Sequence, residues 1–282
     1  MSILQNKIDF AFIITVHNAN PNGDPLNGNR PREDFEGYGE ISDVCIKRKI
    51  RNRLQDMGKP IFVQSDDKRE DSFSSLSERA SGCEPLKKVK DKEKYASIAC
   101  EQWMDVRSFG QVFAFKSTDK GVSVGVRGPV SIHPAFSVSP IDIASIQITK
   151  SVNSEPKAGG IKSSDTMGTK HRVPFGLYVC KGSINCQLAE KTGFTQGDAD
   201  AIHEALCTLF ENDLSSARPE GSMEVRAVYW WKHANKTGQY SSAAVHRSLQ
   251  ITEKVDIPKA FEDYEITLLP LEGLEPEIFR SV

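Results

Sequence analysis

The first pattern along the chain is an apolar run at residues 8–16, IDFAFIITV, followed by a long polar segment. The density of Ile, Val and Phe predicts a buried strand over 8–16. Residues 16–31 read VHNANPNGDPLNGNRP and contain five asparagines and three prolines. Such a composition is typical of a turn-rich loop with few side chains to bury.

Residues 43–57 predict an amphipathic helix directly after this loop. Ser42 is placed to act as the N-cap, with Asp43 favourable in the first turn and Gly58 as the stop signal. The apolar side chains that recur at helical spacing are Ile46, Ile50, Leu54 and Met57. Strand, loop and helix are therefore expected in immediate succession.

The remaining apolar patterns predict mostly strands. We expect a second helix over 195–213 and a short strand at 60–64. Core-like β structure is expected at 106–115 and 123–138. Further strands are expected at 143–152, 175–188, 223–233, 247–255 and 263–270. The order of elements fits an α+β sandwich of the ferredoxin or RNA-recognition type with insertions.

Two segments interrupt this core pattern. Residues 65–94 are rich in Ser, Asp, Glu and Lys, and we expect an insertion lobe that is weakly packed and partly helical near 91–104. Residues 153–174 lie between two predicted strands, are glycine-rich and basic, and contain almost no large apolar side chain. They predict a protruding β arm with a flexible tip.

Charge and cysteine content narrow the possible classes of protein. The 282 residues carry a net charge of −2, so any site for a polyanion must come from a local excess of positive charge. The run at 8–16 contains Asp9 and is too short for a signal or membrane segment, so we expect a soluble, cytoplasmic protein. The six cysteines form no Cys-x-x-Cys pair, which favours free thiols, and Cys180 and Cys186 are expected to share one face of a strand.

The predicted helix at 43–57 carries an unusual concentration of cations. The segment KRKIRNR contains Lys47, Arg48, Lys49, Arg51 and Arg53. Such a cluster repels itself unless anions or acidic partners meet it, and phosphate is a common partner. A solvated helix face is the alternative interpretation.

The opening loop offers a second candidate site for phosphate. Asn and Gly tolerate positive φ and leave backbone N–H groups free to point at an anion. A loop of this kind beside the start of a basic helix could hold a phosphate chain. The alternative is an Asx-rich turn held by its own amides.

The arm is a third candidate. Its cations Lys150, Lys157, Lys162, Lys170 and Arg172 outnumber its acids Glu155 and Asp165. Met167 near the tip could wedge between bases, or it could have no role in a disordered loop. His171 could stack on a base or pair with a phosphate.

An enzyme remains a further alternative. His17, Asp24, Asp34 and Asp43 lie close together in sequence, and a loop carboxylate in a nucleic-acid groove could hold Mg²⁺. No nucleophile elbow, P-loop or dinucleotide motif is present. The segment YWW at 229–231 and the histidines at 133, 203, 233 and 246 are interpreted as structural.

Together these motifs resemble a known family. The segments VHNANPNGDP, NRPR, ISDVCIKRKIRNRL and GVRGPVSI are similar to those of the guide-RNA-binding backbone subunit of type I CRISPR surveillance complexes (Cascade), most of all in subtype I-C. The resemblance extends over essentially the whole chain.

The resemblance implies a modified RNA-recognition fold shaped like a hand. Residues 1–64, 105–142 and 175–282 would form the palm, 65–104 a finger-like insertion and 143–174 the thumb arm. It also implies that several copies stack head to tail along one crRNA guide. Each thumb would reach over the guide of its neighbour and splay out one base, and the other bases would stay free to pair with the target DNA strand.

The resemblance also implies which residues bind RNA, and it implies no catalytic residue, metal or cofactor. The RNA-binding residues would be Asn18, Asn20, Asn22, Gly23, Lys47, Arg48, Lys49, Arg51, Arg53, Met167, Lys170, His171 and Arg172. The implied partners are the large, small and guide-processing or end-capping Cascade subunits, with a helicase-nuclease recruited by the complex and no membrane. The rival is a metal-dependent RNA-cleaving subunit that uses Asp24, as in type III relatives.

Overall fold

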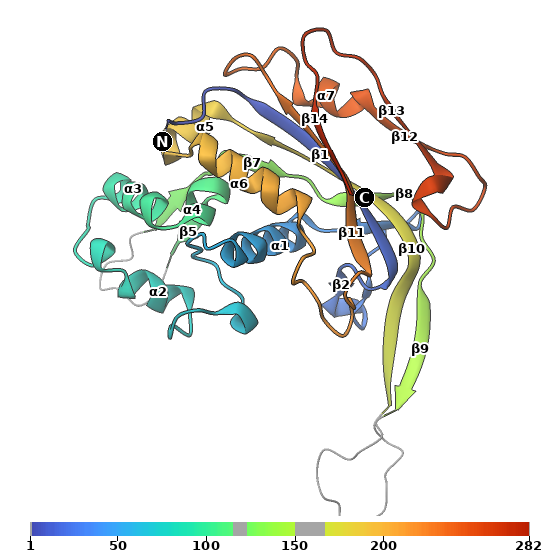
Figure 1. Cartoon of the computed structure of the whole chain (residues 1–282). Helices are drawn as coiled ribbons and strands as arrows, with labels where there is room; N and C mark the ends of the chain where they lie inside the picture. The colour runs from blue at the N-terminus through green and yellow to red at the C-terminus, as the bar shows by residue number, and fades with distance from the viewer. Residues whose placement is uncertain (1, 115–122, 150–166, 282) are drawn as a thin grey trace, which may run out of the picture.

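The computed structural model describes residues 2–114, 123–149 and 167–281 and is organised around one large sheet (Figure 1). Every strand pairing in these three ranges is antiparallel. In spatial order the main sheet contains β14 (Glu277–Arg280), β11 (Met223–Lys232), β1 (Ile8–Ala19), β10 (Met167–Ile184), β8 (Ala135–Pro140) and β4 (Tyr38–Ile41). The short strand β7 (Val130–Ile132) pairs with β10 beside β8.

Strand β1 lies at the centre of the sheet and is buried on both faces. Phe10, Phe12 and Ile14 belong to one hydrophobic cluster, whereas Ala11 and Ile13 belong to another on the opposite face. A strand covered on both sides has apolar residues facing both ways, which explains the nearly continuous run in the sequence; the exceptions are the buried Asp9 and Thr15. The predicted strand is confirmed, and it extends as far as Ala19.

Two helices cover the first face of the sheet. They are α1 (Asp43–Asp56) and α6 (Gln196–Cys207), and both contribute side chains to the same cluster as Phe10 and Phe12. The predicted N-cap Ser42 is observed, and Thr195 caps α6 in the same way; the hydroxyl of each accepts from a backbone N–H group in the first turn. The α+β prediction with an antiparallel sheet is confirmed, while assignment to the RNA-recognition type stays an interpretation.

The second face is covered by the C-terminal part of the chain. Helix α7 (Ser242–Ser248) and the hairpin of β12 (Leu249–Glu253) and β13 (Tyr264–Leu268) pack there, as Figure 1 shows at its upper right. Tyr229 and Trp231 are buried in this layer, whereas Trp230 faces the other cluster. The interpretation of YWW as core is therefore confirmed.

A separate hydrophobic core lies beside the insertion; residues 65–94 contribute only Ala80 and Leu86 to its buried apolar side chains, which agrees with the expectation that this segment is weakly packed. The elements of this region are α2 (Leu76–Gly82), α3 (Lys92–Gln102), α4 (Met104–Phe109), β5 (Gln111–Phe113) and β6 (Val124–Val126). Phe62, Trp103 and Phe113 form the aromatic centre of this core, with ring centroids 4.6 Å and 5.1 Å from Phe62.

Residues 60–64 do not form the predicted strand, because a carboxylate takes the place of a partner strand. Asp105 on α4 is fully buried and accepts from the backbone N–H groups of Phe62 at 2.7 Å and Val63 at 3.1 Å. Its second oxygen also pairs with Arg51 Nε at 3.0 Å. One side chain thus joins the lobe to α1.

Three other local predictions are corrected. Residues 106–109 belong to α4 and not to β structure, and Gly110 ends that helix at a φ of 81°. Cys186 does not share a strand face with Cys180, since Asn185 caps a new helix, α5 (Cys186–Thr192). The helix expected to reach residue 213 ends at Cys207. No helix in the described part of the chain is long and apolar enough to cross a membrane.

The predicted arm is present as an extension of the sheet. Strand β9 (Ala144–Thr149) pairs only with the outer part of β10, from Met167↔Thr149 to Arg172↔Ala144, and the pair projects from the sheet in Figure 1. The predictions for Lys150, Lys157, Lys162, Glu155 and Asp165 lie outside the described residues.

We expect the substitution Asp105→Asn to lower the free energy of unfolding by about 3 kcal/mol, because it leaves Arg51 and one buried N–H without a partner. Urea denaturation would measure this loss. The matched control is Glu93→Gln on exposed α3, which should change stability by less than about 0.5 kcal/mol. Equal losses in the two variants would contradict the role of Asp105.

Candidate nucleic-acid interface

The loop after β1 folds back as a small lobe beside α1. It contains β2 (Gly23–Asp24), the turn η1 (Pro25–Asn27) and β3 (Arg30–Pro31). Asn18, Gly28 and Asn29 have φ values of 50°, 59° and 59°, as expected for a loop built on Asn and Gly. At Gly23 a Cβ atom would lie 2.0 Å from Asn29 Oδ1, so the close approach of these strands requires glycine there.

The amides of this loop hold it together, as the Asx-turn interpretation proposed. Asn20 is buried and its Nδ2 donates to Asn29 O at 2.7 Å. Asn22 Oδ1 accepts from both the backbone N–H and the hydroxyl of Ser42, at 2.9 and 2.8 Å. Asn22 therefore fixes the loop to the N-terminus of α1. Direct RNA contact by Asn20 and Asn22 stays a prediction.

All five cations predicted on α1 have internal partners. Two of them form buried or nearly buried ion pairs, Lys49 with Asp213 and Arg51 with Asp105. The other three contacts are more exposed: Lys47 with Asp43, Arg53 with Glu211 and Arg48 with Val63 O. The self-repulsion of KRKIRNR is thus relieved largely within the chain. Their contact with RNA stays a prediction.

Positive charge still gathers at the first turns of α1. Lys49, Arg218 and Arg32 all act electrostatically on Cys45, and Asp213 is the opposing acid. Burial raises the pKa of the Cys45 thiol, with these cations offsetting part of that rise. Burial also lowers the pKa of Lys49, although Asp213 opposes the change.

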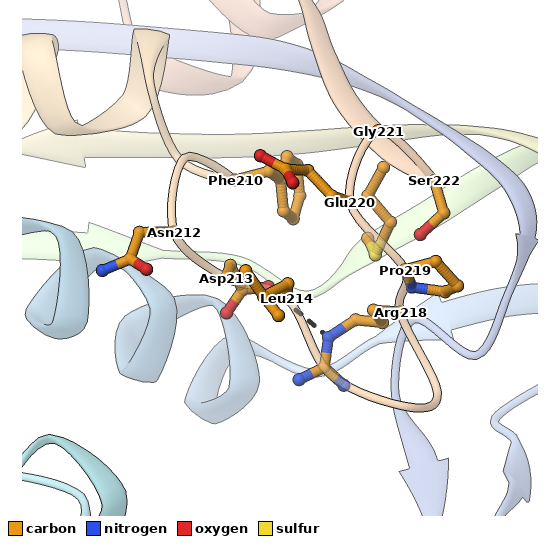
Figure 2. Close-up of a pocket in the computed structure, with 10 residues that line it drawn as sticks. Phe210, Asn212, Asp213, Leu214, Arg218, Pro219, Glu220, Gly221 and Ser222 are labelled. Carbon is orange, nitrogen blue, oxygen red and sulfur yellow. Dashed lines mark ion pairs between the residues drawn. The ribbon is translucent and has the colours of Figure 1, made fainter.

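The loop at 210–222 supplies Arg218 to this cluster. Figure 2 shows Arg218 and Asp213 as an ion pair in the lining of a cavity of about 20 Å³, with Nε 3.4 Å from the carboxylate. A volume of this size holds about one water molecule and no larger ligand. Asn20 N donates to Ala217 O at 2.9 Å, so the opening loop and the Arg218 loop are in contact.

Arg32 and Arg218 have guanidinium groups that are incompletely bonded. The Nε atom of each is buried; that of Arg32 has no hydrogen-bond partner within the described ranges, and that of Arg218 has only the Asp213 carboxylate at 3.4 Å. Arg32 reaches Asp24 only at 3.6 Å and is 36% exposed. These two residues were absent from the predicted site, although NRPR contained the signal for Arg32; nothing in the local sequence marks Arg218.

The base of the arm is bonded to the same lobe. Arg30 Nη1 donates to Ser145 Oγ at 3.0 Å, and Ser145 Oγ lies 2.8 Å from His171 Nδ1. The structure therefore brings together the three predicted regions: the loop, the start of α1 and the arm. Met167 and Lys170 are exposed near the end of the described arm.

The residues named for the enzyme alternative each make a different local contact. Asp24 caps Leu26 N, Asp34 accepts from Glu36 N and Tyr38 N, and Asp43 pairs with Lys47. His17 packs on Phe175 with ring centroids 4.9 Å apart, in a groove of about 580 Å³ beside β12 and β13. No group of three metal-binding side chains occurs among the residues for which coordinates are described.

Among the predicted structural histidines, His233 and His246 are buried. His233 Nε2 lies 2.8 Å from Asp9 Oδ2, and its Nδ1 accepts from Gln239 N. His246 Nε2 lies 3.0 Å from Gly182 O. His203 is half-buried against Trp230, while His133 is exposed. The structural interpretation is confirmed for the two buried rings.

The fold has solved relatives at low sequence identity. One chain of a structure described as "CRISPR RNA-guided surveillance complex, pre-nicking" has a TM-score of 0.54 and 17% identity, and the match covers 84% of this chain and 83% of that one. A chain of another "CRISPR RNA-guided surveillance complex" has a TM-score of 0.46 and 17% identity over 80% of this chain and 68% of that one, which is too low to support an argument. The first match shows a shared fold.

The family follows from the sequence comparisons. The model of "CRISPR-associated protein Cas7" matches residues 6–269, and the chain belongs to this family. A protein described as "CRISPR-associated protein Cas7" from Haloferax volcanii is 26% identical over 239 residues, covering 78% of this chain and 68% of the relative. The family resemblance inferred from the motifs is confirmed; subtype I-C stays a prediction.

We expect Asn22→Ala to loosen the loop from α1, because the Ser42 N–H and hydroxyl lose their acceptor. The free energy of unfolding should fall by about 1–2 kcal/mol. Chemical denaturation would measure this change. Asn27→Ala on exposed η1 is the matched control and should have almost no effect; a stable Asn22→Ala protein would contradict the anchoring role.

Proposed function

We propose that this chain is a backbone subunit of an RNA-guided CRISPR surveillance complex and that it grips the sugar-phosphate chain of the guide. The observation that carries the proposal is the meeting of the loop, the start of α1 and the base of the arm around incompletely bonded arginines. Membership of the Cas7 family supports it. The related solved chain belongs to an RNA-guided surveillance complex.

The proposed interface binds the RNA backbone rather than base edges. Guanidinium groups form two parallel hydrogen bonds to a phosphate, and the Arg32 and Arg218 side chains are 36% and 28% exposed, with their nearest carboxylates no closer than 3.4 Å. Phosphate contacts carry no sequence information, so a guide of any sequence would be accepted. The bases would then remain free to pair with target DNA.

The predicted site residues would act in two ways. Lys49 and Arg51 are almost buried in ion pairs, and we assign them to holding α1 in place. Asn18, Gly23 and Lys47 lie nearer the surface and would contact the guide directly, as would Arg48 and Arg53 through their exposed parts. Asn20 and Asn22 would keep the loop in its binding shape.

The arm would cross the guide bound by a neighbouring copy. His171 and Met167 lie on the ribbon face that is bonded to the lobe, so we assign these two residues to RNA contact. Met167 is 61% exposed and would wedge between bases and displace one of them. Lys170 and Arg172 would add positive charge from the other face.

The same proposal includes an assembly of several copies with other subunits. Several copies would stack along the guide as a filament in the cytoplasm, in a complex of subtype I-C. The large, small and guide-processing subunits would complete the complex, and a separate helicase-nuclease would cut the DNA. The backbone subunit would then need no catalytic residue of its own.

Replacing Arg32 and Arg218 together by Gln should weaken binding of single-stranded RNA and reduce its salt dependence. Each lost phosphate contact should lower the slope of log K against log salt by about 0.7. The slope can be measured by fluorescence anisotropy at several salt concentrations. Arg226→Gln is the matched control because Arg226 lies on β11 outside the proposed interface, where it pairs with Glu224 and Glu262; an unchanged slope in the double variant would contradict the proposal.

Asp24→Ala separates binding from cleavage. The Asp24 carboxylate caps η1 and faces Arg32, which supports a structural use of the group. We expect the loaded wild-type protein to leave complementary RNA intact in the presence of Mg²⁺, as the variant does. Gel analysis of labelled RNA is the measurement, and cleavage that disappears in Asp24→Ala would favour the enzyme.

A further inference from the structure

The groove beside β12 and β13 lies at the root of the arm, where β9 and β10 leave the main sheet (Figure 1). Residues 139–142, at the end of β8 and in the connection to β9, form one wall. Residues 174–176 of β10 form another, and residues 256–259 of the loop from β12 to β13 form a third. The volume of about 580 Å³ is sufficient for a small organic molecule.

Three aromatic rings form a row along this groove. His17 on β1 is the register partner of Phe175 on β10, and their ring centroids are 4.9 Å apart. The Phe175 ring in turn lies 6.4 Å from that of Tyr264 on β13. Phe175 and Tyr264 also pack in the hydrophobic layer on the second face of the sheet, so the core fixes their positions. Such rings attract cations to their faces and alkyl chains to their surfaces.

The charged groups of the groove are mainly acidic. Asp142, Glu253 and Asp256 line it, and Lys259 is the one lysine or arginine among the described residues of the lining. Glu253 accepts from the Ser139 hydroxyl and is thereby fixed. The carboxylates of Asp142 and Asp256 are exposed and have no ion-pair or hydrogen-bond partner within the described ranges. Two carboxylates on different walls are therefore available to a ligand.

We propose that this groove binds a linear aliphatic polyamine, a molecule whose ammonium groups are joined by short methylene chains. The ammonium groups would pair with Asp142 and Asp256, and the methylene chain would lie along the rings of Phe175 and Tyr264. The excess of carboxylates over cations selects a cation. The row of rings and the separate positions of the two free carboxylates select an elongated one.

The same features disfavour other classes of ligand. A nucleic acid or another polyanion would be repelled by the three carboxylates. A metal ion is disfavoured because no three ligating side chains converge in the part of the chain that the structure describes. A monoamine could pair with only one of the two free carboxylates. An organic molecule with at least two positive charges is the class that matches the whole lining.

A bound polyamine would join the root of the arm to the hairpin that covers the second face of the sheet. Asp142 lies two residues before β9, whereas Asp256 belongs to the loop between β12 and β13. The ligand would thus connect two segments that are more than 100 positions apart in the sequence. This site lies apart from the proposed phosphate contacts of Arg32 and Arg218, and the inference does not rest on the proposed function.

Isothermal titration calorimetry with spermidine tests the site on the full chain freed of nucleic acid. We expect saturable binding whose Kd rises roughly tenfold or more when Asp142→Asn and Asp256→Asn are combined. Glu265→Gln combined with Glu272→Gln is the matched control, because both acids are exposed and lie outside the groove. Its Kd should stay within about twofold of the wild-type value. Absence of saturable binding, or equal Kd values in the two double variants, would overturn the proposal.

A ligand series on the wild-type protein gives a readout that needs no variant. Putrescine and n-butylamine have the same four-carbon chain, but only putrescine has an ammonium group at each end. At equal ionic strength putrescine should bind roughly tenfold more tightly than n-butylamine. Equal affinities would show that a two-ended cation is not recognised. Competition by Mg²⁺ as strong as that by spermidine would reveal general counterion binding, and either result would overturn the proposal.

NMR of isoleucine δ-methyl groups locates the ligand. Ile141 and Ile257 line the groove, and Ile257 is 71% exposed. Spermidine should shift both resonances, with Ile257→Val used for assignment, and should leave that of Ile148 on the arm unchanged. Shifts confined to Ile278, which lies beside Glu277 on β14, would place the polyamine on a different acidic surface and overturn the assigned site. Because no RNA is present, a negative result here does not bear on the proposed function.

Discussion

The rest of the structure depends on neutralising the charges of α1 inside the chain. Lys49 pairs with Asp213 in the loop after α6, and Arg51 pairs with Asp105 in the insertion lobe. Ser42, at the start of the same helix, is held by Asn22 of the opening loop. Three segments far apart in sequence are thus positioned by one helix, because buried cations must have partners and those partners come from different lobes.

This arrangement changes where positive charge is available for a nucleic acid. Most of the KRKIRNR side chains are already occupied, while Arg32 and Arg218 on neighbouring loops are only partly bonded. The opening loop in turn is held in shape, because Asn20 bonds to Asn29 O inside the lobe, Asn22 bonds to Ser42 of α1, and Gly23 leaves room for the Asn29 side chain. Our proposal therefore places phosphate contacts on loops that a charged helix holds in position.

The arm follows a simple rule of strand geometry. Alternation of side chains turns one ribbon into a polar surface and an apolar, cationic surface. In our proposal the polar surface contacts RNA, and Lys170 and Arg172 add positive charge from the other surface.

The sequence by itself determined the elements whose signal is local. The apolar run of β1, the N-cap of α1, the positive-φ asparagines and glycines of the loop, and the family motifs were all readable. Residues 60–64 were misread as a strand, and the partners Asp105, Asp213 and Arg218 were missed. These contacts depend on the tertiary structure, because a hydrogen bond or ion pair between residues 42 to 164 positions apart in the sequence does not alter the local hydrophobic periodicity. Only folding decides which buried charge finds a partner and which guanidinium group stays free.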